Sequence, residues 1–156
     1  TRPELGAAAR SDPPGGRRKW TRRIRQMLRK SLYCKIHMAT VTAALPDYIG
    51  SITIDADILD QIGLRVNDAV TVANCRNGER FETYVFRGEP GSRRIEVNGA
   101  AAHLVEPGDR VIIMHYAYMS DAEYAAHRPA AAIMNSDNTI DEIMHYESDR
   151  APSRVF

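Results

Sequence analysis

The peptide bond between Gly50 and Ser51 is the most reactive arrangement that the sequence suggests. A serine hydroxyl can attack the carbonyl carbon of the preceding residue, and the resulting ester can eliminate across the serine Cα–Cβ bond. Glycine on the acyl side leaves that carbonyl sterically open and allows strained backbone conformations. Cleavage by this route would convert Ser51 into a ketone-bearing N-terminal group, an electrophilic cofactor made from the chain itself. A Gly-Ser pair is also a common turn, so other residues must decide between the two interpretations.

Arg80 and Tyr84 are the next candidates, because they are four residues apart in a predicted strand. Side chains alternate along a strand, so both leave the same face, with Cα atoms roughly 13 Å apart. Together they could hold a small acidic ligand, although a solvated arginine and a tyrosine covering the sheet would give the same pattern. Thr83 is expected on the opposite face, and would join this site only through a twist, a bulge or a second subunit.

Two further stretches could bind an anion. Lys35 and His37 share one face of a predicted strand, but lysine on an edge strand also serves merely to prevent aggregation. The turn Asn98-Gly99-Ala100-Ala101 combines small side chains with exposed backbone N–H groups, which suits a carboxylate or simply a tight connection. The histidines lack metal-site spacing, and the sequence has no Ser-His-Asp order, phosphate loop or dinucleotide-binding glycine pattern.

The composition predicts one domain with a basic start. A chain of 156 residues is long enough to bury a real core. Residues 1–26 carry eight basic and two acidic residues, whereas residues 27–156 carry thirteen basic and eighteen acidic ones. We expect 1–26 to be a disordered basic leader, either non-native with Met27 as the natural first residue, or an arm for nucleic acid or an acidic surface. The mildly acidic remainder argues against nucleic-acid binding by the folded part.

The cysteine and hydropathy patterns indicate a cytoplasmic protein without membrane association. Cys34 and Cys75 are far apart and lack CxxC or Cys/His ligand spacing, which argues against a disulfide framework and a zinc site. No apolar run approaches the roughly 18–20 residues that cross a bilayer. The N-terminal segment also lacks the apolar centre of a signal peptide.

Short strands separated by turns dominate the chain from Met27 onward. Strands are expected at 35–42, 51–54, 69–74, 80–86, 94–97, 110–117 and 131–134. One helix is expected over 56–62, between an Asp55 N-cap and Gly63, a helical turn by 104, and a last helix from the capping box 120–123 to about 126. Asn77-Gly78 predicts a hairpin with a type I′ turn. The residues from 139 to 156 are expected to form a flexible tail, and the whole pattern is typical of a small β-barrel.

Five stretches in order carry a resemblance to a known family. They are residues 34–37 (Cys-Lys-Ile-His), 48–55 (Tyr-Ile-Gly-Ser-Ile-Thr-Ile-Asp), 77–84 (Asn-Gly-Glu-Arg-Phe-Glu-Thr-Tyr), 97–103 (Val-Asn-Gly-Ala-Ala-Ala-His) and 107–113 (Pro-Gly-Asp-Arg-Val-Ile-Ile). With this spacing the chain resembles aspartate 1-decarboxylase, the pyruvoyl-dependent lyase that makes β-alanine for pantothenate and coenzyme A biosynthesis. The resemblance runs from Met27 to about Met119 without a gap, and more loosely to about Asn138. It implies a mainly β fold, a double-psi β-barrel with two or three short helices over 27–138, assembled as a homotetramer.

The resemblance also implies a zymogen that matures by autocatalytic cleavage between Gly50 and Ser51. Ser51 would become a covalent pyruvoyl group, in place of pyridoxal phosphate or a metal, and would form a Schiff base with the substrate L-aspartate. Thr83 and Asn98 would assist the cleavage and line the site. Asp47 stands where relatives often carry a histidine or a basic residue, so it could alter the cleavage rate or its dependence on a helper protein.

The implied substrate contacts come from three parts of the sequence. Lys35 and Arg80 would contact the anionic substrate, together with Thr83, and Tyr84 would be the catalytic proton donor. The backbone of Gly99, Ala100 and Ala101 would complete the substrate site.

Two alternatives remain at this level. One is a related pyruvoyl decarboxylase that acts on another acidic amino acid, since the sequence does not measure pocket length. The other is a barrel-type binding module whose basic arm engages nucleic acid, with Gly50-Ser51 as an inert turn.

Overall fold

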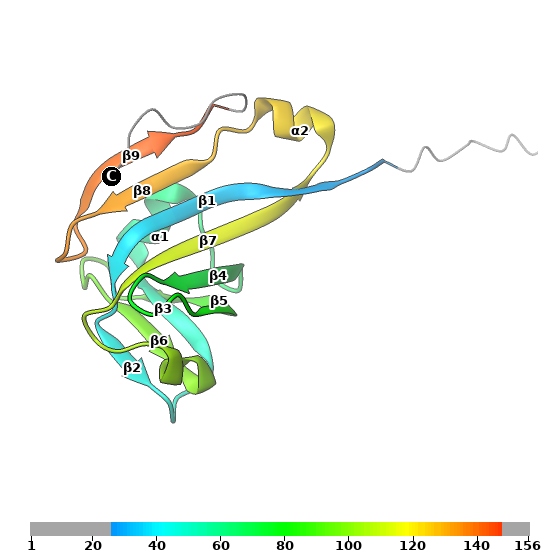
Figure 1. The fold of residues 1–156 in the computed structure, drawn as a ribbon. Coiled ribbons are helices and arrows are strands. Elements are labelled where there is room, and N and C mark those ends of the chain that lie inside the picture. The colour runs from blue at the N-terminus through cyan, green and yellow to red at the C-terminus, as the bar shows by residue number, and fades with distance from the viewer. Residues whose placement is uncertain (1–25, 148–156) are drawn as a thin grey trace, which may run out of the picture.

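The structure is a computed structural model that describes residues 26–147 (Figure 1). Apart from residue 26, the predicted leader lies outside the described residues, as does the end of the predicted tail. The elements in chain order are β1 (Arg29–Thr40), β2 (Ala43–Leu45), β3 (Ser51–Asp55), α1 (Ala56–Ile62), β4 (Ala69–Asn74), β5 (Arg80–Gly88), β6 (Ile95–Asn98), the 3-10 helix η1 (Gly99–Leu104), β7 (Arg110–Met119), α2 (Asp121–Ala126), β8 (Ala130–Met134) and β9 (Ile140–His145).

The strands close into a barrel through the junction between β1 and β2. Hydrogen bonding follows the order β2-β6-β3-β5-β4-β7-β1-β8-β9, and β2 follows β1 after only two residues. Across this junction the Val41 amide donates to Asp109 O at 2.9 Å and the Thr42 amide donates to Ile95 O at 2.8 Å. With β1 and β2 taken as one continuous strand, the ring is therefore β1/β2, β7, β4, β5, β3 and β6, while β8 and β9 extend the sheet beyond β1 (Figure 1).

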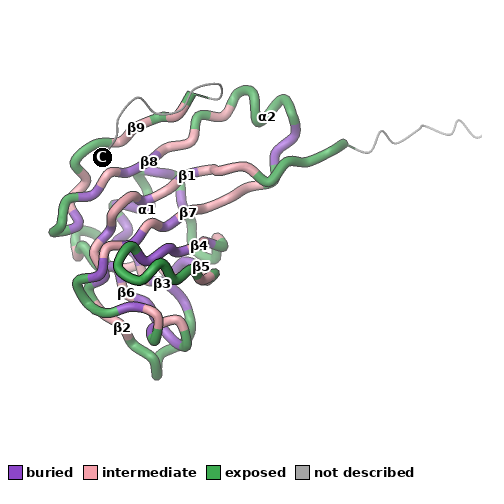
Figure 2. Tube along the Cα trace, in the orientation of Figure 1, coloured by how far each residue is buried: buried purple, intermediate pink, exposed green. Residues whose placement is uncertain are grey.

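Alternating apolar residues fill the interior of this ring. Strand side chains alternate between two faces, and the buried positions lie mainly in the strands of the ring (Figure 2). The side chains that are almost completely buried include Ile52, Ile54, Val70, Val72, Val85, Ile95, Val97, Val111 and Ile113. Burial of each such side chain stabilises the fold by about 1.5–3 kcal/mol relative to full exposure. The intervening residues of β3, β5 and β6 are left on the outer face.

The mainly β class and the short helices are confirmed. Helix α1 has the predicted limits, because the Asp55 side chain accepts from the Asp57 amide and Gly63 ends the helix with φ of 73°. Helix α2 begins with the predicted capping box between Ser120 and Glu123. Both helices are determined by local capping chemistry, which explains why the sequence locates them well.

The hairpin at Asn77-Gly78 is present, but its predicted type I′ turn is wrong. A type I′ turn requires positive φ at both central residues, and here Gly78 has φ of 75° while Asn77 is not in the positive region. Instead the Asn77 side chain accepts from the Glu79 amide at 2.9 Å and donates to Leu104 O at 3.1 Å. The asparagine thus acts through its side chain, which organises a longer loop.

The prediction of a flexible tail from residue 139 is wrong for its first part. Residues 140–145 form β9, which pairs antiparallel with β8. The apolar strand β8 also pairs in parallel with β1, so β9 covers an edge that would otherwise be open. No helix among residues 26–147 is long and apolar enough to cross a membrane.

Candidate active site

The Gly50–Ser51 bond lies where an exposed turn enters a buried strand. The turn closes through a hydrogen bond from the Tyr48 amide to Leu45 O at 3.2 Å. Tyr48 and Ile49 are 55% and 69% exposed, whereas Ser51 is completely buried at the start of β3. The acyl side of the bond is therefore on an accessible loop, and the nucleophilic side is held by the sheet.

Asn98 holds the Ser51 hydroxyl from the neighbouring strand. Ser51 is in register with Asn98 in the antiparallel β3–β6 pair. Asn98 Nδ2 donates to Ser51 Oγ at 2.9 Å and to Thr53 Oγ1 at 3.1 Å, and the Ser51 hydroxyl donates to Ile49 O at 3.3 Å. Asn98 Oδ1 is buried and has no hydrogen-bond partner among the described residues. An acceptor without a partner costs about 1–3 kcal/mol, so it marks a position where a donor would be stabilised.

Gly99 packs directly against the bond that would break. It has φ of 72°, and a Cβ atom there would lie 2.6 Å from Gly50 Cα, 3.0 Å from Gly50 N and 3.3 Å from Tyr48 O. Gly50 itself has no positive φ, and its Cβ would meet nothing nearer than Asn98 O at 4.0 Å. The conformational freedom expected of Gly50 is therefore used at Gly99 instead.

The outer face of three adjacent strands places Tyr84 level with Ser51. In the parallel β3–β5 pair, Ile52 is in register with Val85, and both point into the core. Continuing this register by one residue places Ser51 beside Tyr84, on the opposite face from that core pair. Asn98, Ser51 and Tyr84 therefore form a row across β6, β3 and β5, with about 4.8 Å between neighbouring strands. We call these three residues the site row.

Strand β5 carries Arg80 on the same face as Tyr84. Its pairing with β4 runs without a bulge from Ala73–Arg80 to Ala69–Tyr84. Arg80 and Tyr84 are exposed, and Thr83 is half-buried on the face that also carries the buried Val85. Within one chain, Thr83 is therefore directed away from the site row.

Lys35 lies farther along the sheet. It is in register with Met114 of β7, which is in register with Thr71 of β4, and Thr71 with Glu82 of β5. Three strand spacings, roughly 14 Å, thus separate Lys35 from the β5 backbone. Its ammonium lies over the Tyr146 ring, 5.2 Å from the centroid. On the same strand, burial and then the positive charges of Lys35 and Arg110 lower the pKa of His37.

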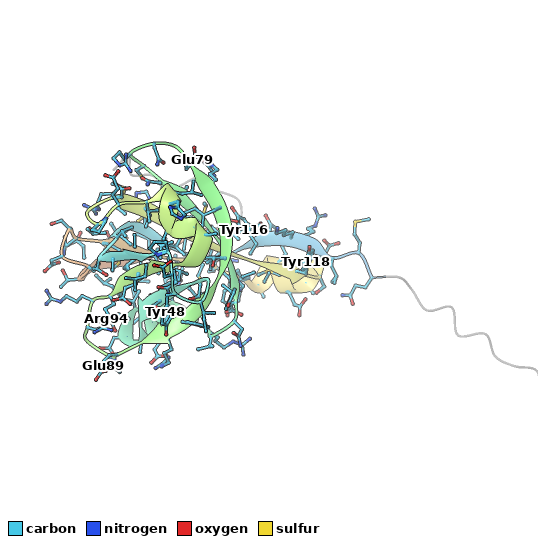
Figure 3. All side chains as sticks on the ribbon, turned by 90° about the horizontal axis from the view of Figure 1, so that it is seen from below. Tyr48, Glu79, Glu89, Arg94, Tyr116 and Tyr118 are labelled. Atoms are coloured by element: carbon cyan, nitrogen blue, oxygen red, sulfur yellow. The ribbon has the colours of Figure 1, made fainter. Side chains whose placement is uncertain are left out.

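A groove of about 650 Å³ opens beside the site row. Its walls include Tyr48, Thr53, Phe86, Arg94 and Asn98. Tyr48 and Arg94 lie on one side of the molecule in Figure 3, whereas Tyr118 lies out on the projecting β1–β7 ribbon. Thr53 was not identified as a site residue from the sequence, although its position two residues after Ser51 in a strand predicts the same face.

Comparison with known proteins identifies the relatives of this chain. The family model described as aspartate decarboxylase matches residues 27–141. An aspartate 1-decarboxylase from Staphylococcus carnosus (strain TM300) is 51% identical over 119 residues, which is 76% of this chain and 94% of the relative. An aspartate 1-decarboxylase from Staphylococcus aureus (strain JH9) is 50% identical over the same length and shares of both chains.

The chain belongs to the aspartate decarboxylase family. Among solved structures, the computationally designed protein msDPBB_sym2 aligns with a TM-score of 0.39 and 19% identity, over 48% of this chain and 94% of the designed one. Membership of the family and the closed ring of strands agree with the predicted double-psi β-barrel.

Enzymes of the aspartate decarboxylase family depend on a pyruvoyl group, and the surroundings of Ser51 fit one. The donor that now lies 2.9 Å from Ser51 Oγ, Asn98 Nδ2, would suit a carbonyl oxygen equally well. Asn98 Oδ1 remains available as an acceptor for a bound amine. No group of three or more His, Cys, Asp or Glu side chains in the described part of the chain is arranged to hold a metal ion.

Proposed function

We propose that the chain is made as a proenzyme, cleaves itself between Gly50 and Ser51, and then converts L-aspartate to β-alanine and CO2 for pantothenate and coenzyme A biosynthesis. The observation that carries the proposal is the Ser51 hydroxyl, buried and hydrogen-bonded to Asn98 directly after an exposed turn, in a chain of this family. An inert Gly-Ser turn would not need a buried amide from the adjacent strand.

In the proposed self-cleavage, Ser51 Oγ attacks the carbonyl carbon of Gly50. The hydrogen bond from Asn98 holds Oγ at the start of β3, and the accessible loop lets the Gly50 carbonyl turn toward it. The developing oxyanion needs a donor, which can contribute a few kcal/mol to the rate. The Thr83 hydroxyl is our candidate. The bond between Gly50 C and the Ser51 nitrogen then breaks, the nitrogen takes up a proton, and an ester through Ser51 Oγ remains. β-Elimination of this ester releases Gly50 as a new C-terminal carboxylate and leaves a dehydroalanine at position 51, and addition of water with loss of ammonia completes the ketone.

In the proposed decarboxylation, Arg80 binds the β-carboxylate of L-aspartate. A salt bridge to the leaving α-carboxylate would stabilise the ground state and resist loss of CO2, so the bidentate guanidinium acts better on the group that stays. The pyruvoyl group supplies the electron sink for this chemistry. Tyr84, level with Ser51, returns a proton to the former α-carbon as general acid. Lys35 contributes positive charge toward the anionic substrate or toward Tyr84, and the backbone of residues 99–101 lines the site.

A complete site needs more than one copy of the chain in this proposal. Thr83 faces away from the site row, and Lys35 lies three strands from β5, so a second copy would have to supply them. A homotetramer meets this requirement. The same proposal includes a cytoplasmic location, where L-aspartate is available, and a helper protein that speeds maturation in a chain with Asp47 before Tyr48.

Intact mass spectrometry combined with a β-alanine assay tests the proposal. We expect two fragments that meet between residues 50 and 51, with the larger lighter by one ammonia than a serine-started peptide, and formation of β-alanine from L-aspartate. The Ser51→Ala variant is the matched control and should remain one inactive chain. A single uncleaved wild-type chain without activity, but with salt-sensitive nucleic-acid binding, would support the binding-module alternative instead.

The Arg80→Ala variant tests substrate selection separately. A cation left without its carboxylate rejects neutral amino acids strongly, so its removal should reduce discrimination between aspartate and alanine by several orders of magnitude. If the matured variant kept the wild-type preference for aspartate over alanine, Arg80 would not be the carboxylate contact. A wild-type preference for a longer acidic amino acid would identify the alternative decarboxylase.

A further inference from the structure

The end of the β4–β7 pairing carries a side-chain contact to the strand backbone. This pairing runs from Asn74–Val111 to Val70–His115. Beyond it, β7 continues to Met119 beside β1, as a ribbon that projects from the barrel (Figure 1). At the last pair the His115 imidazole turns back, and its Nδ1 atom lies 2.8 Å from Ala69 O. A side-chain hydrogen bond from His115 thus continues the contact between β7 and β4 beyond the last backbone pair.

The partners of His115 determine its orientation. A carbonyl oxygen can only accept, so Nδ1 carries the proton and donates it to Ala69 O. Nε2 then faces the Asp68 carboxylate, 3.7 Å from Oδ2. The Tyr33 ring packs edge-on against the imidazole, with centroids 5.5 Å apart. The side chain is only 14% exposed, so these three neighbours leave it little freedom.

The backbone that His115 holds is the part of β4 opposite Tyr84. Ala69 is in register with Tyr84, and Asp68 O accepts from the Val85 amide at 3.1 Å. Arg80 is at the other end of β5, opposite Ala73. Ala73 is itself paired with Ile112 of β7, well inside the ladder. Loss of the His115 contact would therefore loosen the end of the sheet that carries Tyr84 and leave the end that carries Arg80 in place.

We propose that His115 is a positioning residue for Tyr84. Its Nδ1–H group fixes the Ala69 carbonyl, which keeps the strand beside Tyr84 in the geometry needed for proton transfer. This inference rests on the proposed function, because it assigns His115 to the step in which Tyr84 acts as general acid. His115 contacts no reacting atom and acts through the backbone alone.

Three substitutions separate the two ring nitrogens. His115→Asn keeps a donor close to the Nδ1 position, whereas His115→Gln places its amide near the Nε2 position and His115→Leu keeps neither. On matured, folded enzyme we expect Asn to retain kcat within about twofold, and Gln and Leu to lower kcat about tenfold with KM for aspartate unchanged. A tenfold loss is modest beside the roughly hundredfold cost of a 1 Å misplacement.

A double-mutant cycle with Tyr84→Phe gives the decisive readout. If His115 acts through Tyr84, His115→Leu should lower kcat in the wild-type background and cause no further loss in the Tyr84→Phe background. Equal losses in both backgrounds, or a loss in KM alone, would overturn the proposal. His127→Leu is the matched control, because the His127 ring stacks on the same Tyr33 ring with centroids 4.8 Å apart, and its Nε2 atom lies 2.8 Å from Tyr33 O. It should leave kcat unchanged.

The wild-type protein distinguishes failure of the proposed function from failure of the positioning role of His115. If wild type neither cleaves nor makes β-alanine, the proposed function fails, whatever the His115 variants do. If wild type is active and His115→Leu is equally active, only the positioning role fails. Thermal unfolding of each variant shows whether a loss of kcat accompanies a loss of fold. If His115→Leu does not fold, the comparison of kcat between His115→Asn and His115→Gln still tests the positioning role.

Discussion

Substitution of Gly99 by alanine should slow maturation strongly while leaving most of the fold intact. The added Cβ would lie 2.6 Å from Gly50 Cα, whereas carbon atoms in contact prefer about 3.5–4.0 Å. Relief of that overlap requires the Gly50 segment to move by about 1 Å, and a misplacement of this size costs roughly hundredfold in rate. The φ of 72° adds about 1–2 kcal/mol of backbone strain for a residue with a Cβ atom. We therefore expect a destabilised, folded variant whose self-cleavage is at least about hundredfold slower.

The matched control is Gly78→Ala. Gly78 has φ of 75°, and a Cβ atom there would meet nothing within 4 Å, so this variant has the backbone strain without the overlap. Chemical denaturation should show a loss of about 1–2 kcal/mol for Gly78→Ala and at least as much for Gly99→Ala. A time course of intact mass should show self-cleavage at the wild-type rate for Gly78→Ala and not for Gly99→Ala. Equal cleavage rates in the two variants would refute the argument that contact between Gly99 and Gly50 sets the geometry of the scissile bond.

Two further predictions concern titratable groups away from the scissile bond. Burial raises the pKa of the Cys34 thiol to about 12, whereas Cys75 is exposed. Iodoacetamide at pH 8 should therefore modify only Cys75 in the folded protein, and both cysteines in denaturant. Rapid modification of both cysteines in the native protein would contradict this prediction. The Arg76 guanidinium, together with hydrogen bonds from the Glu106 amide and Asn74, lowers the pKa of Asp109 from 3.8 to about 2. The ionised Asp109 carboxylate therefore stabilises the fold above pH 4, and this contribution is lost as the pH falls toward 2. In chemical denaturation, the difference in unfolding free energy between wild type and Asp109→Asn should shrink below pH 4. A difference that is constant from pH 7 to pH 3 would show that the Asp109 charge does not stabilise the fold.

Local chemistry explains which parts of the fold could be predicted from the sequence. The limits of α1 follow from Asp55 and Gly63, whose capping roles depend on neighbouring residues only. Strand β9 could not be predicted because its own sequence is polar and lacks a clear strand pattern, and its pairing with β8 makes it a strand. The turn at Asn77 was misjudged because its side chain bonds to Leu104, which is distant in sequence. Long-range partners account for both errors.

In the candidate site, too, the residues in local motifs could be predicted from the sequence, whereas the positions that depend on strand pairing could not. The Gly50–Ser51 bond and Asn98 are recognisable as motifs, and the structure brings Ser51 and Asn98 into contact. The position of Tyr84 beside Ser51 depends on the register between β3 and β5. The sequence alone does not show which residues of two strands pair, so this position could not be predicted. Arg80 shares the face of Tyr84 as expected from alternation, and the regular strand leaves Thr83 on the other face.

The strand pairing explains how a chain cut at residue 50 can remain one folded unit. The amino-terminal piece would contain β1 and β2, and the carboxy-terminal piece would contain the other strands. β1 pairs with β7 on one side and β8 on the other, and β2 pairs with β6. Ser51 would remain at the start of β3, paired with Asn98. None of these pairings spans the Gly50–Ser51 bond as a continuous strand, so cleavage would leave the strand pairs on both sides of the bond in place. Cleavage instead frees the exposed turn and leaves the reactive end of β3 fixed by the sheet, which is the arrangement that a cofactor derived from the main chain requires.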